Sequence, residues 1–584
     1  MNSLDIPTKI ETVKSSRRKL RLDISMKAID ILEACQAYAA AMGSSIKISS
    51  GVLPEESAPP RPPDRPKVKL SREQLLPPTP SVYLENKKDA FSPQLQEFCL
   101  QHPITVVRGI ANALKLDLGL FSTKMLQEEF ATHPVEVWTQ NKQSADENWD
   151  PVLMKQVWNC PTSVSHCTIG KYALYQAASF QEGLRDDTDK PCSSAAFREM
   201  VANETDPMRR KKKFPILKFG ANVDLSNSSK WRGQLSELIK LPGWTRTVNA
   251  GNMLSHLGHH IVGMNTVRLY MKVPCARVPA HQENNNLCLI NINIGPGDCE
   301  WFGVPHEYWG ALKQLCDKHK INYLSGSWWP NMHELMEEEI PVYRFLQRPG
   351  DLVWVNSGCV YWVQAAGWCN NIAWNVGPLT HKQYSLALER YEWNKLQGHK
   401  SGVGMLLLSW SLARNVRLSD QKLYTAIKNT LLQSLKQIIL TIEVVKSKGL
   451  EIKQHKRRQS DPAHFCSQCE RELYSILFIR EEGKKPTIYC LACAIRKRPQ
   501  LQGFGVCLEE FRLKELLSVY DNFKLHPPPS LPSGGGGAVP QVSPSSASHH
   551  HSSGGSASAL TPEFMAAAAA MGHYPLLSQR MDII

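Results

Sequence analysis

The 584-residue sequence predicts a mainly β protein with helical elements and a small zinc-binding module. Short segments rich in β-branched and aromatic residues, bounded by Gly, Pro and Asn, recur before residue 377, as is typical of the strands of a sandwich or barrel. Residues 381–450 then change to helical spacing. Two CxxC pairs follow the helical region and indicate a metal site.

The strand-like segments read "NTVRLYMKVP", "NLCLININI", "DLVWVNSGCVYWVQ" and "NNIAWNV". Residues 22–45 have helical spacing, and a longer amphipathic helix is expected from Lys422 to a Gly449 cap. These patterns give a domain map. Its expected parts are a partly helical N-terminal segment (1–50), a Pro-rich linker (51–80), an N-terminal region with a basic loop near 185–213 (81–229), the β domain (230–393), a helical region (394–460), the zinc module (461–525) and a disordered tail (526–584).

Composition limits the classes of protein that fit. The chain is too long for one hydrophobic core, and its apolar content of 42% is enough to fold most of it. It has no run of eighteen or more apolar residues and no apolar segment near the N-terminus, so neither a membrane span nor a secretory signal is expected. In a reducing compartment the 16 cysteines are expected to be free thiols or metal ligands rather than disulfides.

The net charge of +14 is concentrated in three basic clusters, Ser15–Arg21, Arg209–Lys213 and Lys453–Arg458. Each is typical of a nuclear import signal or of contact with nucleic acid, and each is equally typical of a solvated charged loop. Together they favour a nuclear location and a DNA or nucleosome contact.

The spacing of four cysteines predicts a structural zinc site. Cys466 and Cys469 form one CxxC pair, and Cys490 and Cys493 form another after twenty intervening residues. Each pair places two thiolates on one tight turn, and two turns supply the four sulfurs of a closed tetrahedral site. The segments "LYSILFI" and "TIYC" between the pairs are expected to form a small hairpin.

His281 and Glu283, one residue apart before a strand-like run, could be two ligands of an iron site. Non-haem Fe(II) oxygenases bind the metal with two histidines and one carboxylate. Alternate residues of a strand point the same way, which is why His-x-Glu can supply two of the three. Taken alone, the motif fits a solvated polar loop as well.

Longer runs around this motif resemble a known family. They include "GNMLSHLGHHIVGMNTVRLYMKVPCARVPAHQENNNLCLININIGPGDCEWF", "PVYRFLQRPGDLVWVN" and "WVQAAGWCNNIAWNVGPLT", with further likeness over roughly 75–525. These runs resemble the jumonji-C domain of the UTX-type histone H3 lysine-27 demethylases. The chain has no 34-residue repeat, so it resembles the shorter branch of that family.

The resemblance implies a double-stranded β-helix (cupin-like) with a GATA-like zinc module beside it. It implies Fe(II)- and 2-oxoglutarate-dependent demethylation of di- or trimethylated lysine 27, with the histone H3 tail and chromatin methyltransferase complexes as partners. His281 and Glu283 match the first two iron ligands. Lys272 and Asn291 match contacts to 2-oxoglutarate, and Tyr270 matches a wall of the methyl-lysine pocket.

Four positions depart from the family. Tyr361, in "SGCVYWVQ", stands where the family has the second iron histidine. Val278 replaces a threonine and Leu289 replaces a serine, both hydroxyls facing 2-oxoglutarate, while Arg268 replaces a glutamine near the methyl-lysine pocket. A tyrosine ligates iron only as phenolate, which its pKa of about 10 disfavours and which suits Fe(III) rather than Fe(II).

Two main hypotheses follow. In the first, the chain is a chromatin interaction protein that has lost most or all demethylation. In the second, it is an active demethylase, with His256, His259, His260 or water completing the iron shell. A third is that the zinc module binds DNA directly.

Overall fold

The computed structural model describes residues 20–527 apart from 44–45, 47, 186–198, 200–202, 456, 459, 483–484 and 505. These residues form two compact units. The first unit comprises the described residues within 1–57, 424–457 and 463–524, and the second those within 58–423, 458–462 and 525–527. The tail expected to be disordered lies, from residue 528 on, outside the described residues.

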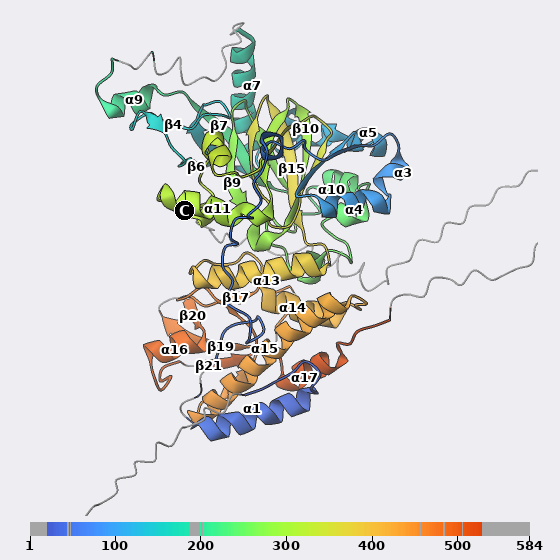
Figure 1. The fold of residues 1–584 in the computed structure, drawn as a ribbon, viewed down its shortest axis with the longest axis vertical. Helices are drawn as coiled ribbons and strands as arrows, with labels where there is room; N and C mark the ends of the chain where they lie inside the picture. The colour runs from blue at the N-terminus through green and yellow to red at the C-terminus, as the bar shows by residue number, and fades with distance from the viewer. Residues whose placement is uncertain are drawn as a thin grey trace, which may run out of the picture. The chain divides into compact units, whose positions relative to one another are not determined.

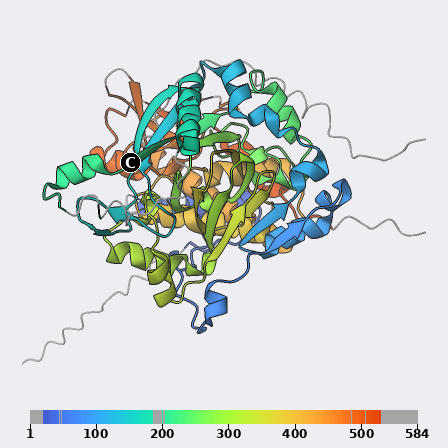
Figure 2. The ribbon, with the colours of Figure 1, turned by 90° about the horizontal axis from the view of Figure 1, so that it is seen from above.

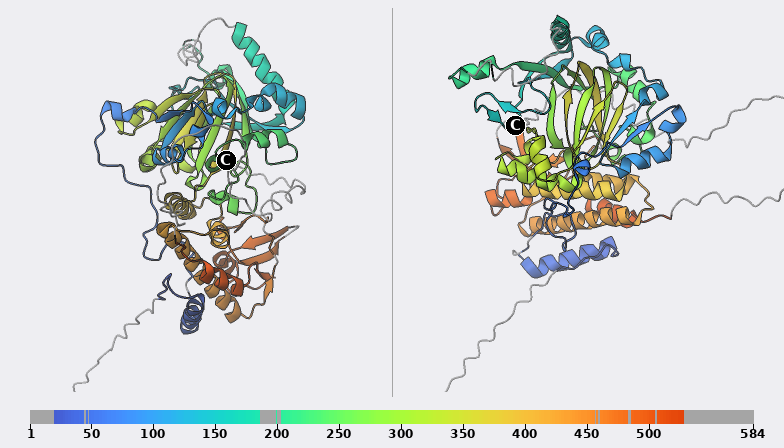
Figure 3. Two further views of the ribbon diagram at one scale, coloured as in Figure 1. Left: turned by 90° about the vertical axis from the view of Figure 1, so that its right-hand side faces the viewer. Right: turned by 45° about the horizontal axis from the view of Figure 1, so that its top comes forward.

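The second unit is built on two sheets (Figures 1 and 3). The larger has nine strands in the order β1-β2-β13-β10-β15-β8-β7-β3-β6, and the smaller has four in the order β12-β11-β14-β9. Apart from the parallel pair β1–β2, neighbours in these sheets are antiparallel. One continuous core contains residues from both sheets, which is the packing of a double-stranded β-helix.

The strands of these two sheets are β1 (Ser81–Tyr83), β2 (Ile104–Arg108), β3 (Pro134–Asn141), β6 (Ser163–Thr168), β7 (Ile216–Asp224), β8 (Arg268–Lys272), β9 (Arg277–Gln282), β10 (Cys288–Pro296), β11 (Cys299–Val304), β12 (Tyr343–Gln347), β13 (Leu352–Val355), β14 (Val360–Ala365) and β15 (Cys369–Val376). A separate hairpin is formed by β4 (Trp149–Asp150) and β5 (Lys155–Gln156). The four segments expected to be strands fall in β8, β10, β13–β14 and β15. The prediction of a mainly β fold with helical elements is confirmed.

Helices border the sheets. In Figure 1, α3, α4, α5 and α10 lie on one side of the larger sheet, and Figure 2 shows its strands from above with helices of residues 87–130 at the rim. The helices of this unit are α2 (Arg72–Leu75), α3 (Lys87–Ala90), α4 (Pro93–Gln101), α5 (Ile110–Leu114), α6 (Thr123–Phe130), α7 (Ile169–Arg185), α9 (Pro207–Lys213), α10 (Arg232–Leu238), α11 (Trp309–Lys318), α12 (Met332–Glu337), α13 (His381–Leu396) and α14 (Met405–Asn415). Single 3-10 turns are η2 (Leu118–Phe121), η3 (Gly243–Thr245), η4 (Met253–His256), η5 (Asn284–Asn286), η6 (His306–Tyr308) and η7 (Tyr323–Ser325).

One stretch differs from its expected conformation. The basic run 209–213 was expected in a loop, but it lies on the exposed helix α9. Asp206 caps this helix by accepting a hydrogen bond from the backbone N–H of Met208, and Pro207 occupies its first position. Both residues are favoured at a helix start, so the local sequence does account for the helix. The rest of the expected loop lies mostly outside the described residues.

The first unit combines helices with a small β module. Its helices are α1 (Ala28–Met42), α15 (Gln421–Ser447), α16 (Leu491–Lys497) and α17 (Leu513–Asn522), of which α15 begins three residues inside the second unit. Its strands are β16 (Ile452–Gln454), β17 (His464–Phe465), β18 (Glu472–Leu473), β19 (Ile476–Glu482), β20 (Lys485–Tyr489) and β21 (Val506–Glu509). Buried Lys428 of α15 donates to the carbonyls of Tyr520 and Phe523, which joins α15 to α17.

Among the described residues, no helix has both the length and the apolar character needed to cross a membrane. Thirteen of the described cysteines are free, as expected. Cys275 is disulfide-bonded, so the expectation of free thiols or metal ligands is wrong at that position.

Candidate functional site

The strand register brings the iron-type residues together. In the smaller sheet β9 pairs with β14, and His281 lies directly opposite Tyr361. Their ring centroids are 4.6 Å apart. Glu283 follows the end of β9 and is buried. The structure therefore places Tyr361 where a ligand on the strand facing His281 would have to lie.

His281 and Glu283 still converge. His281 Nε2 lies 3.4 Å from Glu283 Oε1. The other ring nitrogen, Nδ1, is 2.8 Å from the carbonyl oxygen of Pro279. Each ring nitrogen of His281 therefore faces an oxygen acceptor, and a hydrogen bond from Nε2 to Glu283 needs the proton on that nitrogen instead of the free lone pair that would bind a metal.

Glu283, however, is occupied by donors of the protein itself. Oε1 accepts a hydrogen bond from the hydroxyl of Tyr361, and Oε2 accepts one from Asn375 Nδ2 at 3.0 Å. Arg268 Nη2 lies 3.7 Å from Oε1. Although burial alone would raise the pKa of Glu283, the hydrogen bond from His281 and the charge of Arg268 lower it to about 2. The carboxylate is thus an anion already balanced by its neighbours.

Tyr361 acts here as a donor. Burial and the adjacent Glu283 charge raise the pKa of Tyr361 well above its ordinary value, so its oxygen keeps its proton. Its ring is also stacked on Trp301, with centroids 5.5 Å apart. A protonated phenol has no negative charge to offer a metal, whereas an imidazole at this position would offer a neutral nitrogen lone pair.

The residues present do not fit a resident ferrous ion. Of the three ligands that such a centre needs, the described residues supply His281 and Glu283, and no third His, Cys, Asp or Glu ligand atom lies close to this pair. The positively charged guanidinium of Arg268 lies beside Glu283, so it would repel a ferrous ion at this position. His256 and His259, considered as replacements, each direct a ring nitrogen to a backbone carbonyl of their own loop, that of Ala250 and that of Leu257.

The residues matched to 2-oxoglutarate contacts lie on β8 and β10. Lys272 is buried, and its Nζ is 5.6 Å from the centroid of the Tyr270 ring. Asn291 is buried too, and its side-chain oxygen accepts from Gln347 Nε2 at 3.1 Å and from Asn371 Nδ2 at 3.3 Å. Both side chains would need to exchange or extend these contacts to hold a dicarboxylate.

Val278 and Leu289, the two positions at which the resemblance implies hydroxyls, contribute to the same core. Leu289 lies opposite Asn375 on β10 and β15, and Val278 lies opposite Val363 on β9 and β14. Leu289 is fully buried and Val278 is half-buried. Neither side chain can donate to an anion, so the site has two fewer donors than a threonine and a serine would give it.

The four cysteines of the first unit form a cluster. Their sulfur atoms all lie within 4.8 Å of one another, and Cys469 Sγ is 3.8 Å from Cys490 Sγ. Sulfurs of a tetrahedral zinc site at about 2.3 Å from the metal are about 3.8 Å apart, so the cluster fits zinc. The hairpin expected between the pairs is β19–β20, with Phe478 opposite Tyr489, and Cys490 caps α16.

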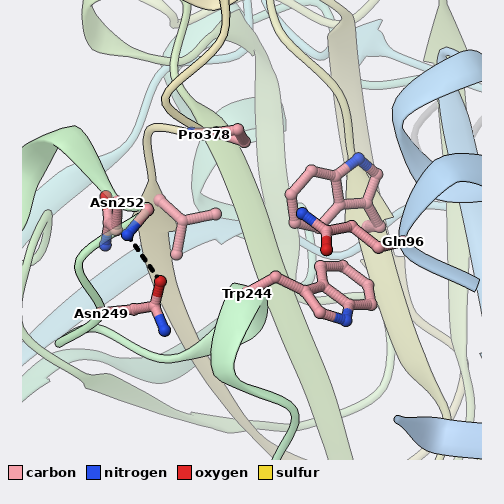
Figure 4. A pocket seen from close by; sticks show the side chains of 8 residues that line it. Gln96, Trp244, Asn249, Asn252 and Pro378 are labelled. Carbon is pink, nitrogen blue, oxygen red and sulfur yellow. Dashed lines mark hydrogen bonds between the residues drawn. The ribbon is translucent and has the colours of Figure 1, made fainter. Parts of the chain in front are cut away.

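One hollow of the second unit lies away from these residues (Figure 4). It has a volume of about 220 Å³ and is lined by residues that include Gln96, Trp244, Asn249, Asn252 and Pro378. None of the residues of the iron-type site lines it, and it lacks the His and carboxylate groups of that site. We therefore place the candidate functional site by its side-chain chemistry, in the interior between the two sheets, and not in this hollow.

Sequence reasoning missed two contacts of Glu283. Asn375 of β15 donates a hydrogen bond to Glu283. Its position within the strand-like segment "NNIAWN" was the feature of the sequence that could have indicated a side chain in the interior. Arg268 was expected near the methyl-lysine pocket, and its contact with Glu283 was not foreseen. Strand patterns predict which face a residue is on, but not which partner a long side chain reaches.

Comparison with known proteins identifies the class. Residues 268–376 match the model of the JmjC domain, hydroxylase, in agreement with the two-sheet fold. Residues 383–438 match the lysine-specific demethylase 6/UTY C-terminal helical domain, and residues 455–513 match the KDM6 GATA-like domain. The chain therefore contains domains of the lysine-specific demethylase 6 family, as the resemblance had indicated.

Two curated relatives are similar over most of the chain. Lysine-specific demethylase 6B of Homo sapiens is 52% identical over 478 residues, which are 79% of this chain and 28% of that protein. Lysine-specific demethylase jmjd-3.1 of Caenorhabditis elegans is 28% identical over 463 residues, which are 76% of this chain and 43% of that protein. The chain thus spans less than half the length of either relative.

Proposed function

We propose that this chain is a nuclear chromatin protein that engages histone H3 tails through its JmjC and zinc modules and has lost most or all demethylation. The observation that carries the proposal is the engagement of Glu283 by Tyr361, Asn375 and Arg268. In this family the equivalent carboxylate has to be free to bind Fe(II). Here it already serves as an acceptor and as a counter-ion inside the protein.

The weakened 2-oxoglutarate contacts support the same conclusion. Val278 and Leu289 cannot donate to an anion, and a hydrogen bond to a charged group contributes about 1.5–3 kcal/mol. Lys272 and Asn291 remain as contacts for 2-oxoglutarate, and Tyr270 as an aromatic wall for a tail side chain. Loss of both the metal ligand and two cofactor donors in one pocket lowers turnover more than either change alone.

Binding functions are better supported than catalysis. The demethylase family whose domains the chain contains supports the histone H3 tail as partner, and we extend this to chromatin methyltransferase-type complexes. The cysteine cluster, with zinc bound, would hold the hairpin β19–β20 and α16 as a recognition surface. The domain boundaries drawn from the sequence, 230–393 for the JmjC domain and 461–525 for the zinc module, stay part of this proposal.

Of the three basic clusters, α9 best suits a DNA or nucleosome contact. Four of its five basic residues are exposed, and among the described residues only Arg209 and Lys213 pair with acidic neighbours, Asp206 and Glu204. In the C-terminal cluster, Arg457 is instead a buried partner of Glu510, with Nη1 3.1 Å from Oε1. The N-terminal cluster lies, up to residue 19, outside the described residues.

Turnover and binding can be measured on the same protein. The full chain is incubated with an H3 tail peptide trimethylated at lysine 27, Fe(II), 2-oxoglutarate and ascorbate, with an active demethylase domain assayed in parallel. We expect no formaldehyde above background, together with measurable binding of the peptide by fluorescence polarisation. Robust formaldehyde release would overturn the loss of activity, and absence of binding would overturn the role in tail recognition.

An active demethylase is the alternative, and one observation favours it. His281 Nε2 and Glu283 Oε1 keep the convergent arrangement of a ligand pair, 3.4 Å apart. If Fe(II) displaced Tyr361 and Arg268 from Glu283, water could complete the shell. Formaldehyde release in the assay above, abolished by His281→Ala, is the result that would establish this alternative.

A further inference from the structure

Strand β8 presents three functional side chains on one face. Arg268, Tyr270 and Lys272 are alternate residues, so they point the same way, toward the interior in which Glu283 lies. The Tyr270 hydroxyl donates to Asn222 Oδ1 at 3.2 Å, which fixes the orientation of the ring. The ring therefore stands between two cations of its own strand.

Arg268 makes two contacts that together describe a cation site. Its guanidinium carbon lies 5.9 Å from the centroid of the Tyr270 ring, and its Nη2 lies 3.7 Å from Glu283 Oε1. An aromatic face beside a carboxylate is the chemistry that binds an alkylammonium group. In this chain the guanidinium of Arg268 already contacts both the Tyr270 ring and the Glu283 carboxylate, and only 20% of the Arg268 side chain is exposed.

An external ammonium cannot share this site. Glu283 is the one carboxylate that contacts Arg268 among the described residues, and its oxygens also accept from Tyr361 and Asn375. On the other side of Tyr270, Lys272 adds a second positive charge. A cationic ligand would have to displace Arg268 and leave its guanidinium partly buried without a counter-ion, which is costly.

We propose that Arg268 is the resident cation of this site and makes tail binding insensitive to lysine methylation. The inference rests on the proposed function, because it assumes that a histone tail binds across the JmjC unit. It adds that the site holds its own substitute for the methylated ammonium. The tail is then recognised by its other residues, whatever the methylation state of the lysine.

The first test compares two peptides on the full-length chain. Unmodified and lysine-27-trimethylated H3 tail peptides are titrated by fluorescence polarisation. We expect affinities within about twofold of each other, since the aromatic and carboxylate groups that would favour the trimethylated form are taken. A preference of about fivefold or more for the trimethylated peptide would overturn the inference even if no variant could be produced.

The second test removes the charge of Arg268 from the site. Arg268→Gln removes the cation with little change in length, and we expect it to bind the trimethylated peptide about fivefold or more tightly than the unmodified one. Arg268→Lys keeps a cation and should stay insensitive. Arg344→Gln is a matched control, since its ion pairs with Asp146 and Glu300 involve none of these residues. An Arg268→Gln variant that folds and still ignores methylation contradicts the proposal.

A third measurement does not depend on histones. Tetramethylammonium chloride is titrated against sodium chloride at equal ionic strength, with binding followed by thermal unfolding. We expect stabilisation by tetramethylammonium in Arg268→Gln and none in the wild type. If neither peptide binds but this difference is seen, the tail-binding function fails while the resident-cation role holds. If the wild type responds as the variant does, that role is wrong.

Discussion

The hydroxyl of Tyr361 donates a hydrogen bond to the carboxylate of Glu283. The resemblance matches these two positions to a histidine and a glutamate of the family's iron site. In this chain the phenol and the carboxylate satisfy each other as donor and acceptor without a metal. Both side chains are buried, so this hydrogen bond meets the polar needs of two interior groups.

Restoring the histidine should restore metal binding only in part. Tyr361→His supplies a nitrogen lone pair, but Arg268 still neutralises Glu283, and Val278 and Leu289 still lack donors for 2-oxoglutarate. We expect weak Fe(II) binding, measured anaerobically by calorimetry, with at least about tenfold weaker 2-oxoglutarate binding than in a Tyr361→His/Val278→Thr/Leu289→Ser triple variant, as two recovered hydrogen bonds imply. Full activity of the single variant would show that the two hydroxyls matter little.

Because of Glu283, the free energy of unfolding should depend on pH in the acidic range. Its pKa is about 2 in the folded chain and about 4.3 when unfolded, so its stabilisation is fully present above about pH 4.3 and is lost as the pH falls toward 2. Between pH 6 and pH 3 the wild type should lose about 2 kcal/mol more free energy of unfolding than Glu283→Gln. Urea unfolding of both proteins at the two pH values measures the difference. Equal losses would mean that Glu283 is not held as a compensated anion.

The fold was largely predictable because strand patterns are local. β10 and β15 are recognisable from alternating and β-branched runs, and the cysteine spacing led directly to the cluster of Cys466, Cys469, Cys490 and Cys493. The pairing of His281 with Tyr361 was also foreseeable, because both belong to strands of one barrel. These features depend on residue type and period alone.

The contacts of long charged side chains were not predictable in this way. Arg268 could be placed near the site but not beside Glu283, and the chain around Arg277 gives no sign of a buried hub. Which partner a guanidinium reaches depends on loops distant in sequence, such as 144–148 for Arg277. The helix α9 was missed for a different reason, since a wholly basic run has no apolar period, and only its Asp-Pro start marks it.

The cysteine cluster should bind about one equivalent of zinc and depend on it for folding. Cys490→Ser removes one of four ligands, so we expect loss of zinc by mass spectrometry and greater proteolysis between β19 and α16. Cys167→Ser is the control, because Cys167 is a free, half-buried cysteine outside the cluster. Zinc retained in the Cys490 variant, or lost equally in the control, would contradict a four-cysteine structural site.

Arg277 should be one of the most sensitive positions for stability in the second unit. It is almost completely buried, and its guanidinium donates to Gln364 Oε1 at 2.9 Å, to Asn148 Oδ1 at 3.2 Å and to the carbonyls of Ser144 and Glu147. It also stacks 4.2 Å from the Trp329 ring. The arginine thus ties the 144–148 loop to β9 and β14.

Replacing Arg277 with Met keeps its apolar volume but leaves these acceptors buried and unpaired, so we expect a loss of about 3 kcal/mol or more in the free energy of unfolding. Arg277→Lys should recover little, since one ammonium cannot match the planar fork. Arg344→Met, at a more exposed arginine, should cost about 1 kcal/mol or less. Denaturant unfolding of the three variants gives the comparison. Equal losses at positions 277 and 344 would show that burial of the guanidinium is not what makes Arg277 important.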